Sequence, residues 1–597
     1  MGKREQKPKR REPPRNPQRK EENDADPPPQ QEPSKGLFTA QNVFFGCVGL
    51  ALLLRLMNVL FTTTVPTVSV LLGDAERYVQ WGQEIAAGNW YGDTTFYQAP
   101  LYPYFLAVLL KCNLGVMGIR LTQAVMGALG VAMLGMAAKK QFGEKVGIAA
   151  AGMMATFPAA IYYDGIIQKA SLASFLLCGL LLMLSQLQQN WKPVPAVLAG
   201  LSLGLLVLTR ENALLWIPVI GIWVWFANAK PSKQARAKTL AAYVAGLAMV
   251  LLPVAARNAS LGGEWSPTTF QAGPNFYIGN NNQADGIYRP LVPGHETPFY
   301  ERADAQKIAE AESGRELTAR EVSKFWMSKS FSEIREAPGR WIALLVQKSF
   351  MVINRYEVPD VDSLEIHREK SAPLKLSSVW NFGFLFPIGV FGLFASRGRW
   401  RDHVLHYVLI AMMIAAVVGF FILGRYRFPL VPLLIPFAAF GLSEIWTHLR
   451  QKTLFKQLKL PLVLGVLAAV LANLPVHDEI GLNASSLKNV GIAVGRSGDY
   501  DRSIGILYRS MEIEPGFADT HFNLGYAYLQ VGQVQKAVQF LSNATQLDPN
   551  LPSANLLLGQ IFERSGDTKT ALQFYQAAAL IPSDREQAIA ALEKLGG

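Results

Sequence analysis

The 597-residue chain is 50% hydrophobic and only 17% charged, which is too apolar for a set of ordinary soluble domains. Its net charge of +12 would suggest a nucleic-acid partner in a soluble protein, but Lys and Arg concentrate here in short loops between apolar segments. Composition therefore predicts an integral membrane protein with no nucleic-acid partner. The three cysteines fall in apolar stretches, so neither a disulfide framework nor a Cys/His metal site is predicted.

Residues 1–36 are rich in Lys, Arg and Pro and contain almost no large apolar side chains. Such a segment cannot bury enough surface to fold, and we expect a disordered basic tail on the cytoplasmic side. The apolar run that follows, near 43–63, is too long for a removed signal peptide and lacks a small-residue cleavage site. We therefore expect it to remain as the first membrane helix.

Basic loops alternate along the rest of the membrane domain, as the positive-inside rule requires when the N-terminus is cytoplasmic. This pattern requires about eleven transmembrane helices, near residues 43–63, 119–138, 146–161, 170–188, 194–209, 213–228, 239–256, 378–395, 403–423, 428–447 and 459–475. Two shorter apolar stretches, 100–112 and 341–353, are expected to be interfacial or re-entrant helices. If 341–353 crossed the membrane instead, the C-terminal domain would lie inside.

The predicted fold class is thus all-α, with a polytopic membrane domain over 37–478 and a large extracytoplasmic loop over 257–340. Residues 481–597 form a separate domain, because apolar density falls there and a 34-residue repeat begins, as in Gly491, Gly525 and Gly559. This period, with small residues where helices cross and a proline that closes each unit, is the signature of tetratricopeptide repeats, which stack into an α-solenoid. Their concave surface suits a peptide or protein partner, and a dimerisation or spacer module is the alternative.

The first outside loop has a carboxylate directly after an apolar span. Asp74, in the sequence LLGDAERY, lies at a membrane boundary, where partial loss of water raises the basicity of a carboxylate. Such a group could act as the general base on an acceptor hydroxyl, with Glu76 and Tyr78 beside it as candidate contacts to acceptor or sugar. The alternative is that Asp74 caps the helix that follows.

Further polar residues fall on the same face of the predicted topology. Asp164, in YYDGIIQK, is a second carboxylate, and Lys169 follows it closely. Arginine is unusual in outside loops, and its guanidinium group suits a phosphate or pyrophosphate ester. The candidates for binding a donor phosphate are therefore Arg210, Arg425, Arg427 and Lys169. Interfacial anchoring is the alternative for each arginine.

The long outside loop contains NFYIGNNNQADG, a segment dense in Asn, Gly and aromatic residues. Such side chains stack on sugar faces and form hydrogen bonds with hydroxyls, so Asn275, Tyr277 and Asn280 are candidate sugar or acceptor contacts. A tight-turn loop packed over the membrane domain is the alternative. The charged stretch 300–337 predicts amphipathic helices over the outer face.

Five motifs, in the order GDAERY, AAGNW, PLYPYF, FPAAIYYDG and GRYRFPLVPLL, make residues 43–447 resemble the GT-C superfamily of glycosyltransferases. The resemblance is to family 39, which includes protein O-mannosyltransferases and lipid A aminoarabinose transferases. It implies inverting transfer of a sugar from a polyprenyl-phosphate donor at the outer face. It also implies that Asp74 and Asp164 are the catalytic carboxylates and that the arginines hold the leaving phosphate.

The chain departs from this family at two places. Ala75 follows Asp74, whereas protein mannosyltransferases often have adjacent Asp and Glu. Gln98, Ala99 and Pro100 stand where aminoarabinose transferases show Lys-Pro. Neither substrate is therefore carried over to this chain.

We expect a multi-pass glycosyltransferase of the bacterial inner (plasma) membrane, with an extracytoplasmic tetratricopeptide domain. The expected partners are a lipid-linked sugar donor, a protein or glycan acceptor and a protein bound by the repeats. The polyprenyl-phosphate sugar is expected as donor substrate, no cofactor follows with certainty from the sequence, and a divalent metal is possible but not indicated. No P-loop, HExxH, GxSxG or CxxC motif is present, which argues against ATP-driven transport, metalloprotease, serine hydrolase and redox functions. The alternatives are a ligase or polymerase with a lipid-pyrophosphate donor and a non-catalytic membrane scaffold.

Overall fold

The computed structural model describes Gly2 and residues 39–226, 231–262, 265–292, 295, 298–377 and 379–596. The predicted disordered tail, 1–36, lies outside the described residues apart from Gly2. All regular elements in the described part of the chain are helices, which confirms the predicted all-α class.

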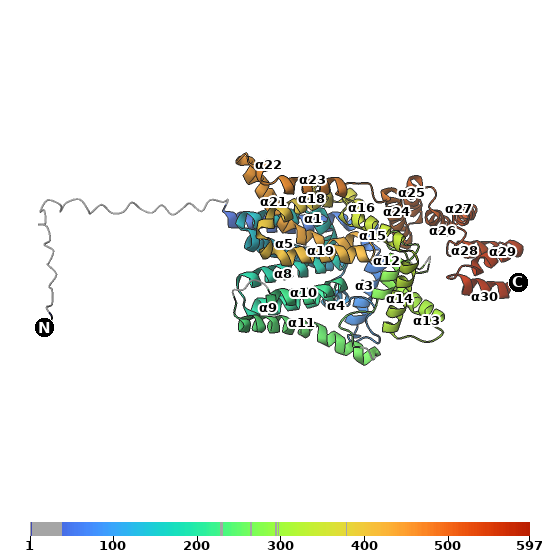
Figure 1. Ribbon diagram of the computed structural model, residues 1–597. Helices are drawn as coiled ribbons and strands as arrows, with labels where there is room; N and C mark the ends of the chain where they lie inside the picture. The colour runs from blue at the N-terminus through green and yellow to red at the C-terminus, as the bar shows by residue number, and fades with distance from the viewer. Residues whose placement is uncertain are drawn as a thin grey trace.

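Long apolar helices lie side by side and form the membrane domain (Figure 1). In the part of the chain that the structure describes, six helical runs are long and apolar enough to cross a membrane. They are α1 (Ala40–Phe61) with its short extension to Thr64, α5 (Val116–Phe142), α8 (Ala170–Gln189), α11 (Lys233–Gly262), the run Phe382–Gly419 and α21 (Leu430–Arg450). The bent pair α6 (Glu144–Thr156) and α7 (Pro158–Gly165) makes a seventh if it is one span.

Shorter apolar helices occupy the remaining predicted spans. They are α9 (Pro193–Val207), η2 (Glu211–Leu215) with α10 (Trp216–Phe226), and α23 (Lys459–Ala472). The run Phe382–Gly419 contains two predicted spans, because α18 (Phe382–Ala395) and α19 (Trp400–Gly419) are separated by η3 (Ser396–Arg399). The segments agree with those expected, while their number of eleven stays a prediction.

A 54° bend separates α6 from α7. Pro158 has no N–H group and cannot continue the hydrogen-bond ladder of α6, so carbonyl groups before the bend lose their helical partners. The guanidinium group of Arg55, in α1, donates to two of these carbonyls, at 3.2 Å to Ala155 and 3.5 Å to Met154. A buried side chain of the first helix therefore stabilises the bend.

The same guanidinium group forms an ion pair with Asp164, near the end of α7, at 2.7 Å. Ser171 donates to the other oxygen of this carboxylate at 2.5 Å. Both charged side chains are buried, and buried charges are stable only when paired in this way. The pair fixes the position of α7, which carries Tyr162 and Tyr163.

At the end of the membrane domain opposite to the start of α1, a layer of helices meets the repeats (Figure 1). The layer contains α3 (Gly73–Ala86), α12 (Ala272–Asn280), α13 (Pro298–Ser313) and α14 (Ala319–Glu336). Helices α13 and α14 occupy the stretch 300–337, where amphipathic helices are expected, and α14 is the amphipathic one. The repeats are α24 (Glu479–Arg496), α25 (Tyr500–Ile513), α26 (Ala518–Gln530), α27 (Val534–Leu547), α28 (Ala554–Arg564), α29 (Thr568–Ala579) and α30 (Arg585–Leu595).

The small residues of the repeat have the packing role that their spacing predicts. A β-carbon built at Gly491 or Gly525 would lie 2.7 Å from Leu507 or Leu541, and one at Gly559 would lie 2.6 Å from Tyr575. Only glycine therefore lets the paired helices approach this closely.

We predict that Arg55→Ala lowers the free energy of unfolding by about 3–5 kcal/mol, because it leaves the Asp164 carboxylate buried without a partner. The double variant Arg55→Met with Asp164→Leu removes both charges and should recover most of this loss. Thermal unfolding of the purified protein in detergent measures both effects. An equal loss in the single and double variants would contradict the buried-pair explanation.

Candidate active site

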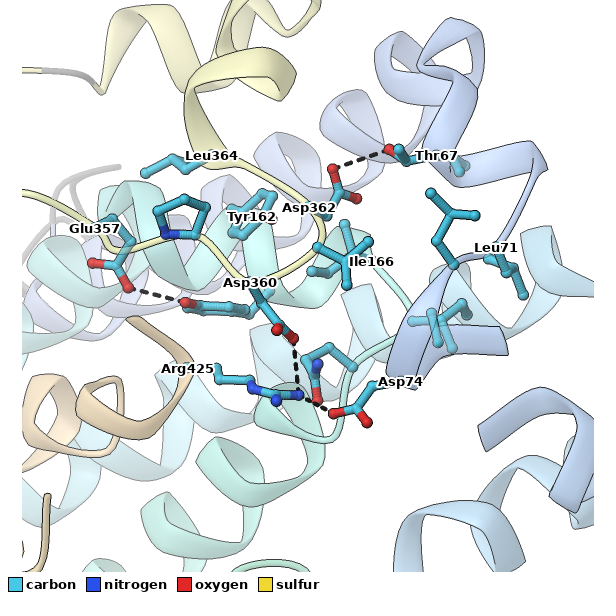
Figure 2. Close-up of a pocket in the computed structure, with 18 of the residues that line it drawn as sticks. Thr67, Leu71, Asp74, Tyr162, Ile166, Glu357, Asp360, Asp362, Leu364 and Arg425 are labelled. Carbon is cyan, nitrogen blue, oxygen red and sulfur yellow. Dashed lines mark hydrogen bonds and ion pairs between the residues drawn. The ribbon is translucent and has the colours of Figure 1, made fainter. Parts of the chain in front are cut away.

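A small cavity of about 50 Å³ lies where α3, α7 and the segment 357–364 meet the start of α20 (Gly424–Arg427). Its polar lining includes Asp74, Glu357, Asp360, Asp362 and Arg425 (Figure 2). These residues come from three distant parts of the sequence. The cavity is therefore a product of the tertiary fold.

Arg425 lies between two carboxylates (Figure 2). Its guanidinium group is ion-paired with Asp74, in the first turn of α3, and its Nη1 atom is 3.0 Å from an oxygen of Asp360. The side chains of Asp74 and Arg425 are both buried. Asp74 is not a helix cap, because the capping position is Leu72 and no side chain caps this helix. The capping alternative is therefore wrong.

Gly73 lets α3 begin against the opposite wall of the cavity. Its φ angle is +58°, and a β-carbon at this position would lie 2.6 Å from a methyl group of Val361. Any larger residue would be both strained and in collision there. The glycine thus holds Asp74 close to the segment that carries Asp360.

The charge state of Asp74 depends on its neighbours. Burial alone would raise the pKa of its carboxyl group, but the charges of Arg425 and Lys169 outweigh this effect, so that the pKa is lowered. Tyr78 also donates to the carboxylate, at 3.3 Å. The raised basicity expected from the membrane boundary is therefore not found while Arg425 is paired with Asp74.

Two further buried cations lie close to the pair of Asp74 and Arg425. Arg210 donates from Nη2 to the carbonyl group of Arg425 at 2.8 Å and lies 5.0 Å from the centre of the Tyr426 ring, while its Nε atom has no hydrogen-bond partner among the described residues. The ammonium group of Lys169 lies 5.9 Å from the centre of the Tyr78 ring. Both side chains are buried. The structure thus brings together three of the four predicted phosphate-binding residues: Arg425 is paired with Asp74, Lys169 acts on the same carboxylate, and Arg210 contacts Arg425.

The fourth, Arg427, has a different setting. It is ion-paired with Glu357 and donates to the carbonyl group of Asn354. Tyr163 donates to the same glutamate at 3.0 Å. Arg427 therefore anchors the segment that forms one wall of the cavity.

The other predicted site residues lie elsewhere. Asp164 is taken up by the ion pair with Arg55 and does not line the cavity. Glu76 forms an ion pair at 3.1 Å with Arg496 of the repeat domain. The segment expected to form a sugar-binding surface is helix α12, where Tyr277 donates to Glu333 at 2.9 Å.

Asn280, at the end of α12, is buried by its partners. It accepts from Lys348 at 3.1 Å and from Trp341 at 3.0 Å, and it donates to the carbonyl group of Gly419 at 2.9 Å. Its side chain thus joins α12 to α15 (Pro338–Ile353) and α19. Neither Asn280 nor Asn275 nor Tyr277 lines the cavity of Asp74.

Sequence reasoning missed the acidic segment VPDVD, which contributes Asp360 and Asp362. Two carboxylates close to an apolar helix were the available signal. It also missed Glu301, in α13, whose carboxyl group accepts from Tyr288 at 3.0 Å. Burial and the charge of Asp74 raise the pKa of Glu301 to about 7. Among the described residues, no group of three or more His, Cys, Asp or Glu is arranged to hold a metal ion.

Helix α24 of the repeat domain touches both walls of the cavity. Arg496 contacts Glu76 of α3, and Asn489 donates to the carbonyl group of Val361 at 3.0 Å. Tyr356 also donates to Asn483 at 3.3 Å. The first repeat helix is therefore packed directly against the candidate site.

Residues 97–256 match the family model described as dolichyl-phosphate-mannose-protein mannosyltransferase, and residues 507–539, 525–566 and 556–589 match models of tetratricopeptide repeats. The chain carries a GT-C glycosyltransferase domain. The family match for this GT-C domain begins after Asp74 and ends before Asp360 and Arg425. The roles of these three residues therefore rest on the geometry of the cavity.

The chain is similar to two solved structures over most of its length. The oligosaccharyltransferase of Archaeoglobus fulgidus in its apo form is 16% identical, with 76% of this chain and 56% of that chain covered and a TM-score of 0.41. ArnT from Cupriavidus metallidurans bound to undecaprenyl phosphate is 15% identical, with 84% of this chain and 80% of that chain covered and a TM-score of 0.39. The chain thus spans little more than half the length of the archaeal protein. No curated protein sequence matches the chain.

We predict a contribution of Glu301 to the pH dependence of stability. Its pKa in the folded protein, about 7, lies above the usual 4.5, so the fold favours the uncharged carboxyl group. This contribution is complete below about pH 4.5 and is lost as the pH rises through about 7. As the pH rises between these two values, the melting temperature of the native protein should therefore fall, and that of Glu301→Gln should fall less. Identical slopes would contradict the prediction.

We also predict that Asn489→Ala with Arg496→Ala loosens the wall of the cavity. Loss of the bond from Asn489 to Val361, together with the ion pair that holds α24 against α3, should speed backbone hydrogen exchange in 355–363 by about tenfold, because each bond is worth about 0.5–1.5 kcal/mol. Hydrogen-exchange mass spectrometry measures the change. Asn523→Ala is the matched control, since this side chain donates to Asp519 within its own helix. Unchanged exchange in the double variant would show that α24 does not support the wall.

Proposed function

We propose that the protein transfers a sugar from a polyprenyl-phosphate-linked donor to an acceptor hydroxyl in the cavity of Asp74. The observation that carries this proposal is the cluster of three buried cations, Lys169, Arg210 and Arg425, at the pair of Asp74 and Arg425. Among the described residues, neither Lys169 nor Arg210 has a carboxylate within ion-pair distance, and buried cations of this kind suit a phosphate ester, which brings its own negative charge. The family description, which names a dolichyl-phosphate-mannose donor, supports the same donor class.

In the proposed reaction, the acceptor oxygen attacks the anomeric carbon of the donor sugar. The new carbon–oxygen bond forms as the bond to the phosphate oxygen breaks on the opposite side, so the configuration is inverted. Asp74 takes the proton of the acceptor hydroxyl. The departing phosphate keeps the bonding electron pair, and the three cations stabilise its growing charge.

Arg425 would link donor binding to the basicity of Asp74. As the structure stands, its pairing with Asp74 lowers the pKa of that carboxyl group and makes it a weak base. A donor phosphate would compete for the guanidinium group, and the pKa of Asp74 would then rise because burial remains. The base would thus become effective only when the donor is present.

Donor binding also requires the cavity to open. A volume of about 50 Å³ has room for water but not for a sugar ring. The wall formed by 357–362 is the part that would move, since it closes on α3 through Val361. In this proposal Asp164 is a positioning residue, which holds α7 through Arg55 and does not touch the substrate.

The repeat domain supports a polypeptide as partner or acceptor. A groove of about 1190 Å³ lies between the repeats and the α12–α14 layer, and residues of both line it, including Tyr277, Glu333, Lys488 and Phe522. Stacked helical repeats commonly offer such concave surfaces to extended chains. We propose that the site and the repeats face the outer side of the bacterial inner membrane, where a lipid-linked donor and an envelope acceptor would meet.

The change Asp74→Asn tests the proposal, because it keeps the shape of the side chain and removes the base. Transfer should fall by about 10²–10⁴-fold, the usual contribution of a general base. Mass spectrometry of envelope glycans and glycoproteins measures it, in cells that make native and variant protein at equal levels. Asp402→Asn, at the far end of the membrane domain, is the control and should leave transfer unchanged. Normal glycosylation with Asp74→Asn would rule out the proposed base.

The donor class is tested with purified protein. Sugar should be transferred from a polyprenyl-monophosphate sugar, and Arg425→Gln should reduce this transfer at least as strongly as it reduces donor binding. If sugar were transferred only from a polyprenyl-pyrophosphate sugar, the proposed donor would be wrong and the protein would use the donor class of a ligase or polymerase.

A further inference from the structure

A second cavity, of about 420 Å³, lies against a different face of α3. Four of its lining residues follow a spacing of i, i+3, i+4 and i+7 and so share one side of the helix: Arg77, Gln80, Trp81 and Glu84. The opposite wall comes from the segment 89–98, Tyr104 of α4 (Leu101–Lys111), Arg257 of α11 and Arg302 of α13. The volume lies within the range of about 300–1000 Å³ that is usual for small-molecule sites.

The lining has the composition of a sugar site. Three aromatic rings form a cluster, with ring centres 5.9 Å apart between Trp81 and Phe96 and 6.2 Å apart between Phe96 and Tyr104. The amide side chains of Gln80, Asn89 and Gln98 also line the cavity. Aromatic faces bind the apolar side of a sugar ring, and amides donate to and accept from its hydroxyls.

Two guanidinium groups of this cavity form hydrogen bonds only with neutral oxygens, and that of Arg257 also stacks on the ring of Phe96, 3.6 Å from its centre. Arg257 donates to the carbonyl groups of Tyr91 and Thr94, at 2.6 and 3.0 Å, and to the amide of Asn258 at 3.2 Å. Arg302 donates to the hydroxyl group of Thr94 at 2.9 Å and to the carbonyl group of Thr95 at 3.3 Å.

Among the described residues, neither arginine has a carboxylate within ion-pair distance. Arg257 is only 8% exposed, and a buried charge is normally paired. Of the acids in the lining, Glu84 is paired with Arg77 at 3.5 Å, and Asp93 acts on Arg257 only at longer range. The cavity therefore has positive charge left over for an external anion.

We propose that this cavity binds a negatively charged saccharide as part of the acceptor. The proposal rests on the proposed function, because the cavity and Asp74 share helix α3. A saccharide stacked on Trp81 would have its carboxylate or phosphate group at Arg302 and Arg257, and its next unit could reach the first turn of α3. The chain would thus act on an acidic glycan, or on a polypeptide that carries one.

Binding to the purified full-length protein in detergent tests this inference. The probes are a disaccharide of glucuronic acid and glucose, and cellobiose as its neutral counterpart, measured by titration calorimetry and saturation-transfer NMR. The native protein should bind the acidic disaccharide at least about tenfold more tightly, the effect of one charge-assisted hydrogen bond. Arg302→Gln should remove this preference, and Trp81→Leu should weaken the binding of both probes.

Three further variants separate the explanations. Arg302→Lys keeps the charge and should keep part of the preference, which distinguishes a lost contact from a lost fold. Arg335→Gln, an exposed arginine on the neighbouring α14, should behave as the native protein. Asp74→Asn should bind the acidic disaccharide normally even though transfer is lost, so a failure of the proposed base leaves this site testable. Equal binding of the two probes by the native protein, no binding of either, or an unchanged preference in Arg302→Gln would each overturn the proposal.

Discussion

Arg425 and Asp74 stand 351 positions apart in the chain and meet in a buried ion pair. The pair can form only when α3, which follows the first helix, lies against α20, which precedes α21. Asp360 joins it from a third segment. Because unpaired charges are costly in a site with little water, the pair couples the assembly of the site to the assembly of the whole membrane domain. Removal of one partner would therefore affect the fold of the site as well as its chemistry.

A second buried pair, Arg55 with Asp164, has a contrasting role. It lies at the bend between α6 and α7, and its guanidinium group also satisfies the carbonyls that the bend leaves free. It thus sets the direction of α7 and, through it, the position of Tyr163, which contacts Glu357 in the cavity wall. One pair faces the cavity, where we propose that a ligand exchanges for one of the partners, while the other is enclosed and holds its surroundings in place.

The helical fold and the repeats could be predicted from the sequence, because the spacing of hydrophobic residues and of small residues shows the period of each directly. It also singled out Asp74, Arg210 and Arg425, since charges beside apolar spans are unusual. The partner of Asp164 was missed although Arg55 stands inside an apolar helix, where an ionisable residue signals a buried contact. Asp360 was missed because its place depends on how 357–362 folds over α3. The segment NFYIGNNN was predicted from composition as a loop surface, whereas tertiary contacts through Asn280 and Lys348 make it the helix α12.

Helix α24 belongs to two units at once. By its period it is the first helix of the repeats, yet its side chains Asn489 and Arg496 reach the wall of the cavity and helix α3. The later repeats are free of this constraint and can diverge with whatever partner they bind. We therefore expect α24 to have evolved together with residues 355–362, and the remaining repeats to have evolved independently of them. The functional border between the two units thus falls after Arg496, which is one helix later than the repeat pattern alone would place it.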